Sequence, residues 1–373
     1  MTPKERFICA LNLGTPDRVP TFELEFQLAP ELMGKDFLRE EELIGLSESE
    51  IDQKLYENAE YLVKVYTHLE HDAICLHYLN DEHLCKTARI IKEITNDRFM
   101  LLTHGDGTFA IPDGNGMEEL AYLIAEDPEE VDRQAEEMCV RAIERNRRLL
   151  KGGFDGFILC SDYCFNMGPF LSPKMFSRFI TPYLKRIIED IRMQGGYAIK
   201  HTDGNIMPIL DQLVSCNPHA LHSIDPMAGV DIKEIKHLTA GKIALCGNVH
   251  CAHMQTGTEQ DVIDSCEYCL THAKPGGGYI FATSNIPFKG LPLERYQLVL
   301  DIWKKYRNYE YFVKRGGKPK PSAPDFAKSV LNMRFPRFDL MKSALKFLIL
   351  LESGKCILYN KNGSLDSKNK FYI

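Results

Sequence analysis

The stretch "SPKMFSRFITPYLKRIIEDIRMQGGYAIKHTDGN", residues 172–205, contains a complete helix-to-strand unit. Ser172 and Pro173 form a typical helix start, because serine caps the first turn and proline fits the first helical position. Gly195 and Gly196 end the helix, and the run 197–203 then predicts a strand. This strand ends in a polar histidine, threonine, aspartate and glycine, which predict either a turn or a chemical site.

The same unit recurs along the chain. Short apolar runs alternate with longer segments of helical periodicity, and the runs predict strands at 19–26, 72–79, 154–161, 197–203, 220–225, 242–249 and 278–284. Strands that alternate with helices form a parallel sheet covered by helices. The number of units favours a (β/α)8 TIM-type barrel, and no G-x-G-x-x-G follows the first strand to support a Rossmann fold.

Two segments depart from this alternation. The run 98–116, "RFMLLTHGDGTFAIPDGNG", predicts a β-hairpin inserted near the barrel mouth. From residue 311 onward the chain has 13 Lys/Arg against 4 Asp/Glu, whereas residues 1–310 have 32 against 48. We therefore expect a barrel domain over 1–310 and a basic extension over 311–373 that is loosely packed or partly disordered.

Composition narrows the possible classes of protein. The 373 residues are 44% hydrophobic and 26% charged, and the net charge of -7 argues against general nucleic-acid binding. No signal-peptide pattern and no run of about 20 apolar residues is present, so we expect a cytoplasmic protein without a membrane span. The 12 cysteines then predict reduced thiols, and the pair Cys266 and Cys269 predicts helix packing rather than a redox or metal site.

In a TIM-type barrel, the chemistry lies at the carboxyl ends of the strands. Polar residues occur at these ends in every predicted unit. They are Glu23, Glu25, His77, Asp81, Asp162, His201, Asp203, His222, Asp225, Asn248, His250, Ser284 and Asn285. Histidines and carboxylates around one mouth are suited to a divalent metal site or to acid–base chemistry.

Several of these segments together resemble a known family. The runs 168–206, 219–237, 242–262 and 275–296 resemble the uroporphyrinogen decarboxylase superfamily, and so does the opening "TPKERFICALNLGTPDRVP". This superfamily groups the porphyrinogen decarboxylase with cobalamin-dependent methyltransferases on a (β/α)8 barrel. The resemblance covers roughly residues 1–306.

The residues favour the methyltransferase branch. The decarboxylase is similar only in part, because its arginine motif "RQAGR" is replaced here by "VPTFELEFQLAPEL", which brings Glu23 and Glu25. Carboxylates at the mouth would repel a tetrapyrrole that carries many carboxylates. The chain also resembles the members of this branch that methylate thiols. Those members have the pattern H-x-C where this chain has His201 and Asp203, and a later cysteine where this chain has Ser284.

The resemblance implies zinc held by His201, Asp203 and Glu25, with Asp162, His222 and Asn248 in catalytic roles. The oxygen-rich ligand set suits a methoxy or methylamine donor, and the acceptor would be the corrinoid of a separate partner protein. Two alternatives remain open at this point. They are a uroporphyrinogen decarboxylase-type lyase and a barrel that binds a ligand without catalysis.

Overall fold

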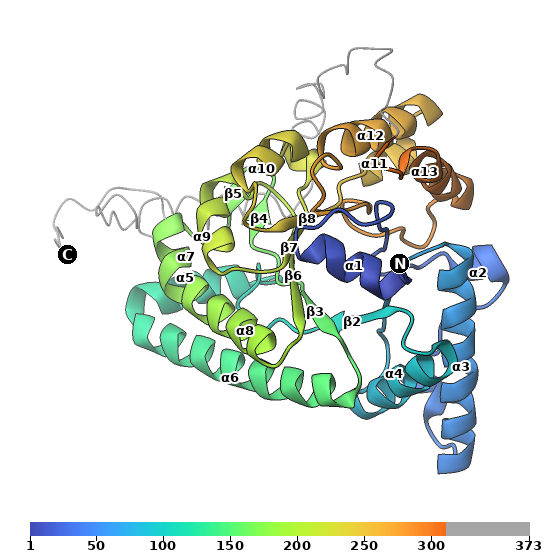
Figure 1. Ribbon diagram of the computed structural model, residues 1–373. Helices are drawn as coiled ribbons and strands as arrows, with labels where there is room; N and C mark the ends of the chain where they lie inside the picture. Colours follow the sequence, from blue (N-terminus) through green and yellow to red (C-terminus); the bar gives the residue numbers. More distant parts are fainter. Residues whose placement is uncertain (311–373) are drawn as a thin grey trace, which may run out of the picture.

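A computed structural model describes residues 1–310 of the chain, and its centre is a curled parallel sheet (Figure 1). The sheet has seven strands in the order β1-β2-β3-β6-β7-β8-β9, and all neighbours pair in parallel. The bounds are β1 Ala73–Cys75, β2 Met100–His104, β3 Gly156–Leu159, β6 Tyr197–Thr202, β7 Ala220–Ser223, β8 Ala244–Cys246 and β9 Tyr279–Ile280.

Residues 19–26 complete the ring between β9 and β1. Thr21 forms a parallel bridge with Phe281, and its carbonyl accepts a hydrogen bond of 2.8 Å from the amide of Asp72, directly before β1. This segment, which we call the first stave because it comes first in the chain, occupies the eighth strand position of the barrel. It forms a single β-bridge there in place of the predicted strand. The predicted TIM-type barrel is confirmed.

The predicted hairpin at 98–116 is wrong. Met100–His104 is a barrel strand that pairs in parallel with both β1 and β3. Its first four residues are buried, as a strand between core and helices requires. The short antiparallel pair that does exist lies later, between β4 Cys164–Phe165 and β5 Gly168–Pro169.

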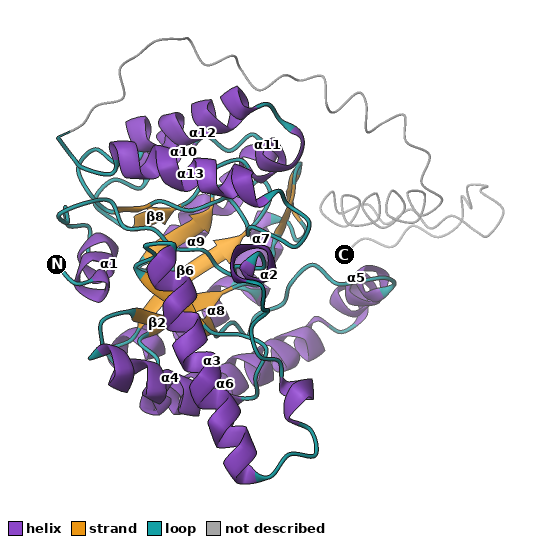
Figure 2. Ribbon diagram, turned by 90° about the vertical axis from the view of Figure 1, so that its right-hand side faces the viewer, coloured by secondary structure: helices purple, strands orange, loops and turns teal. Residues whose placement is uncertain are grey.

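Helices surround the barrel (Figure 2). The longer ones are α3 Glu48–His68, α4 Asp81–Thr95, α5 Gly116–Glu126, α6 Pro128–Gly152, α8 Thr181–Met193, α12 Glu259–His272 and α13 Leu293–Tyr306. The shorter ones are α2 Ala29–Met33, α7 Pro173–Phe179, α9 Leu210–Ser215, α10 Ile232–Leu238 and α11 Cys251–Thr256. Helix α8 begins anew after α7 because Pro182 cannot donate a backbone hydrogen bond within a continuous helix.

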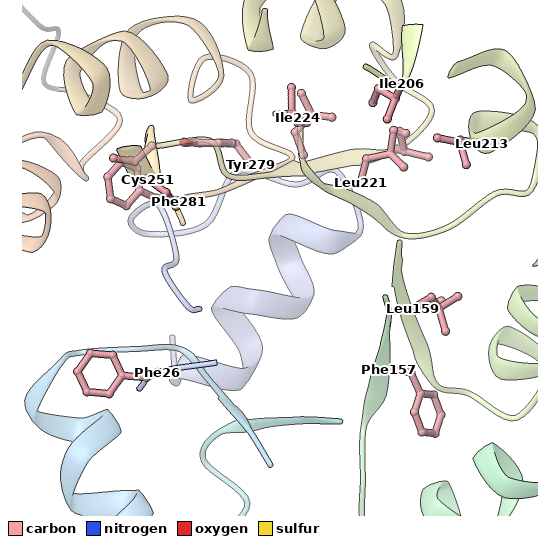
Figure 3. Close-up of a cluster of buried hydrophobic side chains, with 14 of the residues drawn as sticks. Phe26, Phe157, Leu159, Ile206, Leu213, Leu221, Ile224, Cys251, Tyr279 and Phe281 are labelled. Carbon is pink, nitrogen blue, oxygen red and sulfur yellow. The ribbon is translucent and has the colours of Figure 1, made fainter. Parts of the chain in front are cut away.

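Helix α1, Pro3–Leu11, fills the amino-terminal end of the barrel. Its Phe7, Ala10 and Leu11 pack with the inward-facing residues of the strands, and Lys4 donates from its amide to the carbonyl of Arg98, just before β2. A second core lies between the strands and the outer helices. Figure 3 shows Phe157 and Leu159 of this outer core on the side of β3 that faces away from α1.

Three further expectations concern a membrane span, the pair Cys266 and Cys269, and the extension at 311–373. Within 1–310, no helix is both long and apolar enough to cross a bilayer. Cys266 and Cys269 are buried in α12, where burial raises the pKa of both thiols, so the predicted packing role is confirmed. The extension at 311–373 lies outside the described part of the chain.

Candidate metal centre

Three predicted residues converge at the carboxyl ends of β3 and β6. Asp162, His201 and Asp203 each offer a ligand atom, and these atoms all lie within 4.8 Å of one another. His201 Nε2 is 3.7 Å from Asp162 Oδ1 and 3.8 Å from Asp203 Oδ1. Two ligands of one tetrahedral zinc lie about 3.3 Å apart, since each is about 2 Å from the ion. We call these three side chains the mouth cluster. A small movement would bring their ligand atoms to the spacing found around a tetrahedral zinc ion.

The local chain fold explains how the strand end reaches this position. Gly204 follows Asp203 with φ of +81°, and a Cβ there would lie 2.3 Å from the carbonyl oxygen of Cys164. Only glycine fits this turn without strain. The amide of Asp203 donates to Asp162 Oδ1 at 3.0 Å, and the amide of Gly204 donates to Asp225 Oδ2 at 3.1 Å. The turn thus fixes two members of the mouth cluster relative to each other.

Neighbouring side chains orient the carboxylate of Asp203. Ser223 donates its hydroxyl to Oδ1 at 2.6 Å, and Asn285 donates its side-chain amide to Oδ2. Burial raises the pKa of Asp203, although the His201 ring opposes this shift. Burial likewise lowers the pKa of His201. A neutral imidazole has a lone pair available, which is the form a metal requires.

His222 contacts the opposite side of the His201 ring. The two Nδ1 atoms are 2.9 Å apart, so one nitrogen donates and the other accepts. When His201 Nδ1 carries the proton, its Nε2 lone pair points to the two carboxylates. His222 is 1% exposed, and burial holds its pKa well below the usual range, so it remains a neutral partner. A second group that fixes the tautomer in this way is the usual arrangement behind a metal-binding histidine.

The mouth cluster is accessible from one side. The side chains of Asp162 and Asp203 are 46% and 31% exposed, whereas His201 is 6% exposed. The carboxylates therefore face the open mouth, and the imidazole forms the floor. Three protein ligands with an open position are typical of catalytic rather than structural zinc sites.

Two predicted site residues lie apart from this cluster. Asn248 donates to the carbonyl of Ile224 at 2.7 Å and accepts from the thiol of Cys269 at 3.2 Å, so both ends of its amide are engaged elsewhere. Glu25 accepts a hydrogen bond of 2.6 Å from Gln27 and is not among the residues that could hold the ion. The catalytic role of Asn248 and the metal role of Glu25 stay predictions.

One mouth residue was missed by sequence reasoning. His104 ends β2, its side chain is exposed, and its ring centroid is 4.5 Å from that of His77. Desolvation lowers the pKa of His104, and His77 and His201 lower it further to a smaller extent, whereas the Glu25 carboxylate opposes the shift. Had residues 98–104 been read as a buried apolar strand, His104 would have appeared among the polar strand ends.

Comparisons with known proteins give a family and a fold. No curated protein sequence is similar enough to count as a match. A solved methyltransferase from Methanosarcina mazei is similar in structure, with a TM-score of 0.62 and 15% identity over 82% of this chain and 99% of that chain. An N-acetylneuraminate lyase from Mycoplasma synoviae is a more distant likeness, with a TM-score of 0.35 and 13% identity over 68% of this chain and 73% of that chain.

The family comparison covers the sequence that forms the site. The uroporphyrinogen decarboxylase (URO-D) family model matches residues 83–306, which is more than half of the chain. The matched part includes β2 and all strands from β3 to β9, and therefore the whole mouth cluster. The chain belongs to the uroporphyrinogen decarboxylase family.

Proposed function

We propose that this protein is a zinc-dependent methyltransferase that moves a methyl group between a small methylated donor, of the methoxy or methylamine type, and a corrinoid protein. The observation that carries the proposal is the convergence of Asp162, His201 and Asp203 at the open mouth of the barrel. The fold that the chain shares with the Methanosarcina mazei methyltransferase supports it. Zinc bound there would act as a Lewis acid on the heteroatom of the donor.

The chain's own residues would prepare this site before the donor arrives. His222 holds the tautomer of His201, while Ser223 and Asn285 fix the carboxylate of Asp203. Two oxygen ligands and one nitrogen ligand form a harder site than one built on thiolates, which suits an ether or amine donor. Ser284, at the position where relatives carry a cysteine, is buried and donates to Cys251 Sγ at 3.5 Å.

The residues do not favour the decarboxylase alternative. Glu25 lies beside the mouth without a cationic partner in the described chain, and a substrate rich in carboxylates would be repelled there. A non-catalytic barrel would have no need for three ligand atoms aimed at one point. Methyl transfer therefore accounts for more of the observed arrangement than either alternative.

Metal analysis of the purified protein tests the proposal first. We expect about one zinc per wild-type chain and less than a tenth of that in His201→Ala. His237→Ala, which removes an exposed histidine on α10, should keep its zinc. Wild-type protein that binds no zinc, or His201→Ala protein that binds as much as wild type, would contradict it.

Activity is then measured as methylation of cob(I)alamin, followed by its absorbance, with methoxylated and methylamine donors. We expect turnover by wild type and by His237→Ala, and a loss of at least about 1000-fold in His201→Ala, because the Lewis acid is lost. Release of carbon dioxide from uroporphyrinogen, without methyl transfer from any donor, would support the lyase instead.

A further inference from the structure

A buried ion pair lies behind the end of β3. Lys200, in β6, is 0% exposed, and its ammonium nitrogen is 2.8 Å from Oδ2 of Asp106, in the loop after β2. Its neighbour Ile199 belongs to the inner core, so Lys200 faces the outer helices. Because β3 lies between β2 and β6 in the sheet, the pair crosses behind β3, from which the chain continues to Asp162.

Stability alone does not explain a charged pair in this place. The surrounding layer is apolar, and Phe157 and Leu159 of β3 belong to it (Figure 3). Charges are costly to remove from water, and apolar side chains of similar size often stabilise a protein as well as a buried ion pair does. The contacts of the pair therefore have to show what else it does.

All three protons of Lys200 and both oxygens of Asp106 are engaged. Lys200 donates to Asp106, to the carbonyl of Leu159 at 3.0 Å and to the carbonyl of Ser161 at 2.9 Å. Asp106 Oδ1 accepts from two backbone amides and from the hydroxyl of Thr108. Its Oδ2 accepts from Lys200 and from the amide of Ser161, which is 3.0 Å away. A buried polar network that is fully satisfied holds its members in one arrangement.

The pair fixes Ser161 through both of its backbone groups. Leu159 is the last residue of β3 that pairs with β6, so Ser161 lies beyond the strand ladder. Its amide donates to Asp106 and its carbonyl accepts from Lys200, in place of strand partners. Hydrogen bonds to charged groups are stronger than those between neutral groups. Asp162 is the next residue, so the pair determines where its side chain begins.

Asp162 depends on this support more than Asp203 does. The carboxylate of Asp203 accepts hydrogen bonds from the side chains of Ser223 and Asn285. In residues 1–310, the carboxylate of Asp162 accepts a hydrogen bond only from the backbone amide of Asp203, and it is 46% exposed. Its distance from His201 is therefore set mainly by the backbone that carries it.

Tyr163 connects the other side of Asp162 to the same pair. Its ring centroid is 4.0 Å from the ammonium nitrogen of Lys200. Because a carboxylate can only accept, the Thr108 hydroxyl donates to Asp106 at 2.7 Å, and the Tyr163 hydroxyl then donates to Thr108 at 2.6 Å. The residues before and after Asp162 are thus both held by the ion pair.

We infer that the buried pair of Asp106 and Lys200 positions Asp162, because it fixes the backbone on both sides of this residue and so keeps the carboxylate within ligand distance of His201. Both members act through Ser161 and Tyr163, so they are positioning residues and not ligands. The consequence for zinc rests on the proposed function, whereas the positioning of Asp162 does not.

The test compares two buried ion pairs in the full chain. Lys200→Met combined with Asp106→Asn removes the pair behind β3 and leaves neither partner charged. Arg6→Met combined with Asp72→Asn is the control, because it removes a buried pair at the amino-terminal end of the barrel, between α1 and the residue before β1. Thermal unfolding checks that both double variants are folded and how far each is destabilised.

Hydrogen exchange of the metal-free chain, measured by mass spectrometry, follows the positioning itself. Without the pair behind β3, residues 160–166 should exchange at least about tenfold faster, while the control should change this rate less than about twofold. Zinc affinity, measured by competition with a chromophoric chelator, should fall about 10–100-fold in the first variant, as is typical when a group that orients a ligand is lost. It should fall less than about threefold in the control.

Thr108→Val is a milder variant, because it removes only the hydroxyl between Asp106 and Tyr163. It should cause both changes to a smaller extent, about three- to tenfold, and Thr108→Ser, which keeps the hydroxyl, should change both values less than about twofold. Unchanged exchange at 160–166, or zinc losses that are equal in the two double variants, overturns the inference.

The two measurements also separate this inference from the proposed function. Hydrogen exchange needs no zinc, so a wild-type chain that takes up no zinc while the variants change exchange as expected refutes the methyltransferase alone. Normal zinc binding by wild type, with exchange at 160–166 unchanged in the variants, refutes the positioning alone.

Discussion

Two clusters in this barrel combine a buried histidine with a carboxylate, and they differ in what the carboxylate contacts. The mouth cluster consists of Asp162, His201 and Asp203. The other, which we call the wall cluster, consists of Glu23, His71, Thr283 and Tyr296, and lies between the first stave, the end of β9 and α13.

Burial shifts the pKa values in both clusters in the same directions. In the wall cluster it raises the pKa of Glu23 to about 8 and lowers that of His71 to about 3. In the mouth cluster it raises the pKa of Asp203 and lowers that of His201. A shifted pKa therefore does not by itself distinguish a reactive site from a structural one in this protein.

The hydrogen bonds do distinguish them. Glu23 accepts from the amide of Thr283 at 3.2 Å, from its hydroxyl, and from Tyr296 at 3.3 Å. These hydrogen bonds occupy both carboxylate oxygens of Glu23, so the wall cluster offers no open ligand position. At the mouth, by contrast, His201 Nε2 and the nearby carboxylate oxygens are more than 3.5 Å apart and face an open side. The comparison teaches that convergent ligand atoms on exposed carboxylates, and not shifted pKa values, mark the candidate site.

Asp203→Asn is expected to have the largest effect, a loss of zinc affinity that tests the difference between the two clusters. The substitution removes a charged ligand and places an amide against the donor Asn285. Zinc affinity should therefore fall by about 1000-fold. This exceeds the loss of about 10–100-fold that is typical when a hydrogen-bond partner of a metal ligand is removed. Competition with a chromophoric chelator measures the affinity. Glu23→Gln serves as the matched control and should change zinc affinity by less than about threefold. Equal losses in both variants would show that the two clusters are not distinct.

The second effect concerns stability and pH. Glu23 titrates near 4.5 when unfolded and at about 8 when folded, so the folded state keeps its proton over that range while the unfolded state loses it. The wild type therefore loses stability as pH rises from 4.5 to 8. Since glutamine mimics the protonated form, the stability of Glu23→Gln relative to wild type should rise by about 3–4 kcal/mol between pH 5 and 8.

Denaturant unfolding at several pH values measures this difference. The contribution of His71, whose folded pKa is about 3, is present in both proteins and cancels when they are compared. A difference that stays constant from pH 5 to 8 would show that Glu23 is already ionised in the folded protein. It would also remove the similarity between the two clusters.

The third and smallest effect is expected from His222→Phe. Without the acceptor for His201 Nδ1–H, zinc affinity should fall about 10–100-fold while the protein stays folded. His222→Asn places a carbonyl oxygen near the same position and should restore most of the affinity. If zinc affinity follows unfolding temperature across the two variants, the role of His222 is packing and not the positioning of His201.

The barrel and the end that carries the candidate site could be predicted from sequence because both depend on local patterns. Apolar runs with polar ends included Asp162, His201 and Asp203 among the candidates, and the order of the strands placed them at one edge. The sequence predicted Glu25 as the third metal ligand and Asp162 as a catalytic residue, whereas the structure brings Asp162 beside His201 and Asp203. The hairpin error had a local cause too. The glycines at 105 and 107 are typical of a turn, yet Gly105 follows a barrel strand and is needed there because a Cβ would lie 2.7 Å from the ring of Phe157.

The contacts between distant segments could not be predicted in this way. Asn285 donates to Asp203 across 82 residues, and Thr283 donates to Glu23 across 260. Glu23 and Glu25 are two residues apart in sequence and look equivalent, but one is enclosed in the wall and the other borders a cavity. The different surroundings of Glu23 and Glu25 arise from how the barrel closes. This closure depends on contacts between distant segments and cannot be predicted from a short stretch of sequence.

The position of helix α1 has a consequence for the order in which substrates bind and products leave. Phe7, Ala10 and Leu11 fill the amino-terminal end of the barrel, and the carboxylates of the mouth cluster are exposed at the opposite end. Under the proposed function, the donor and the corrinoid protein share the mouth as their entrance. A carrier seated over it encloses a donor that is already inside and shuts out one still in solution. Turnover would then follow a compulsory sequence, with the donor entering first, the carrier arriving second and the demethylated product leaving last.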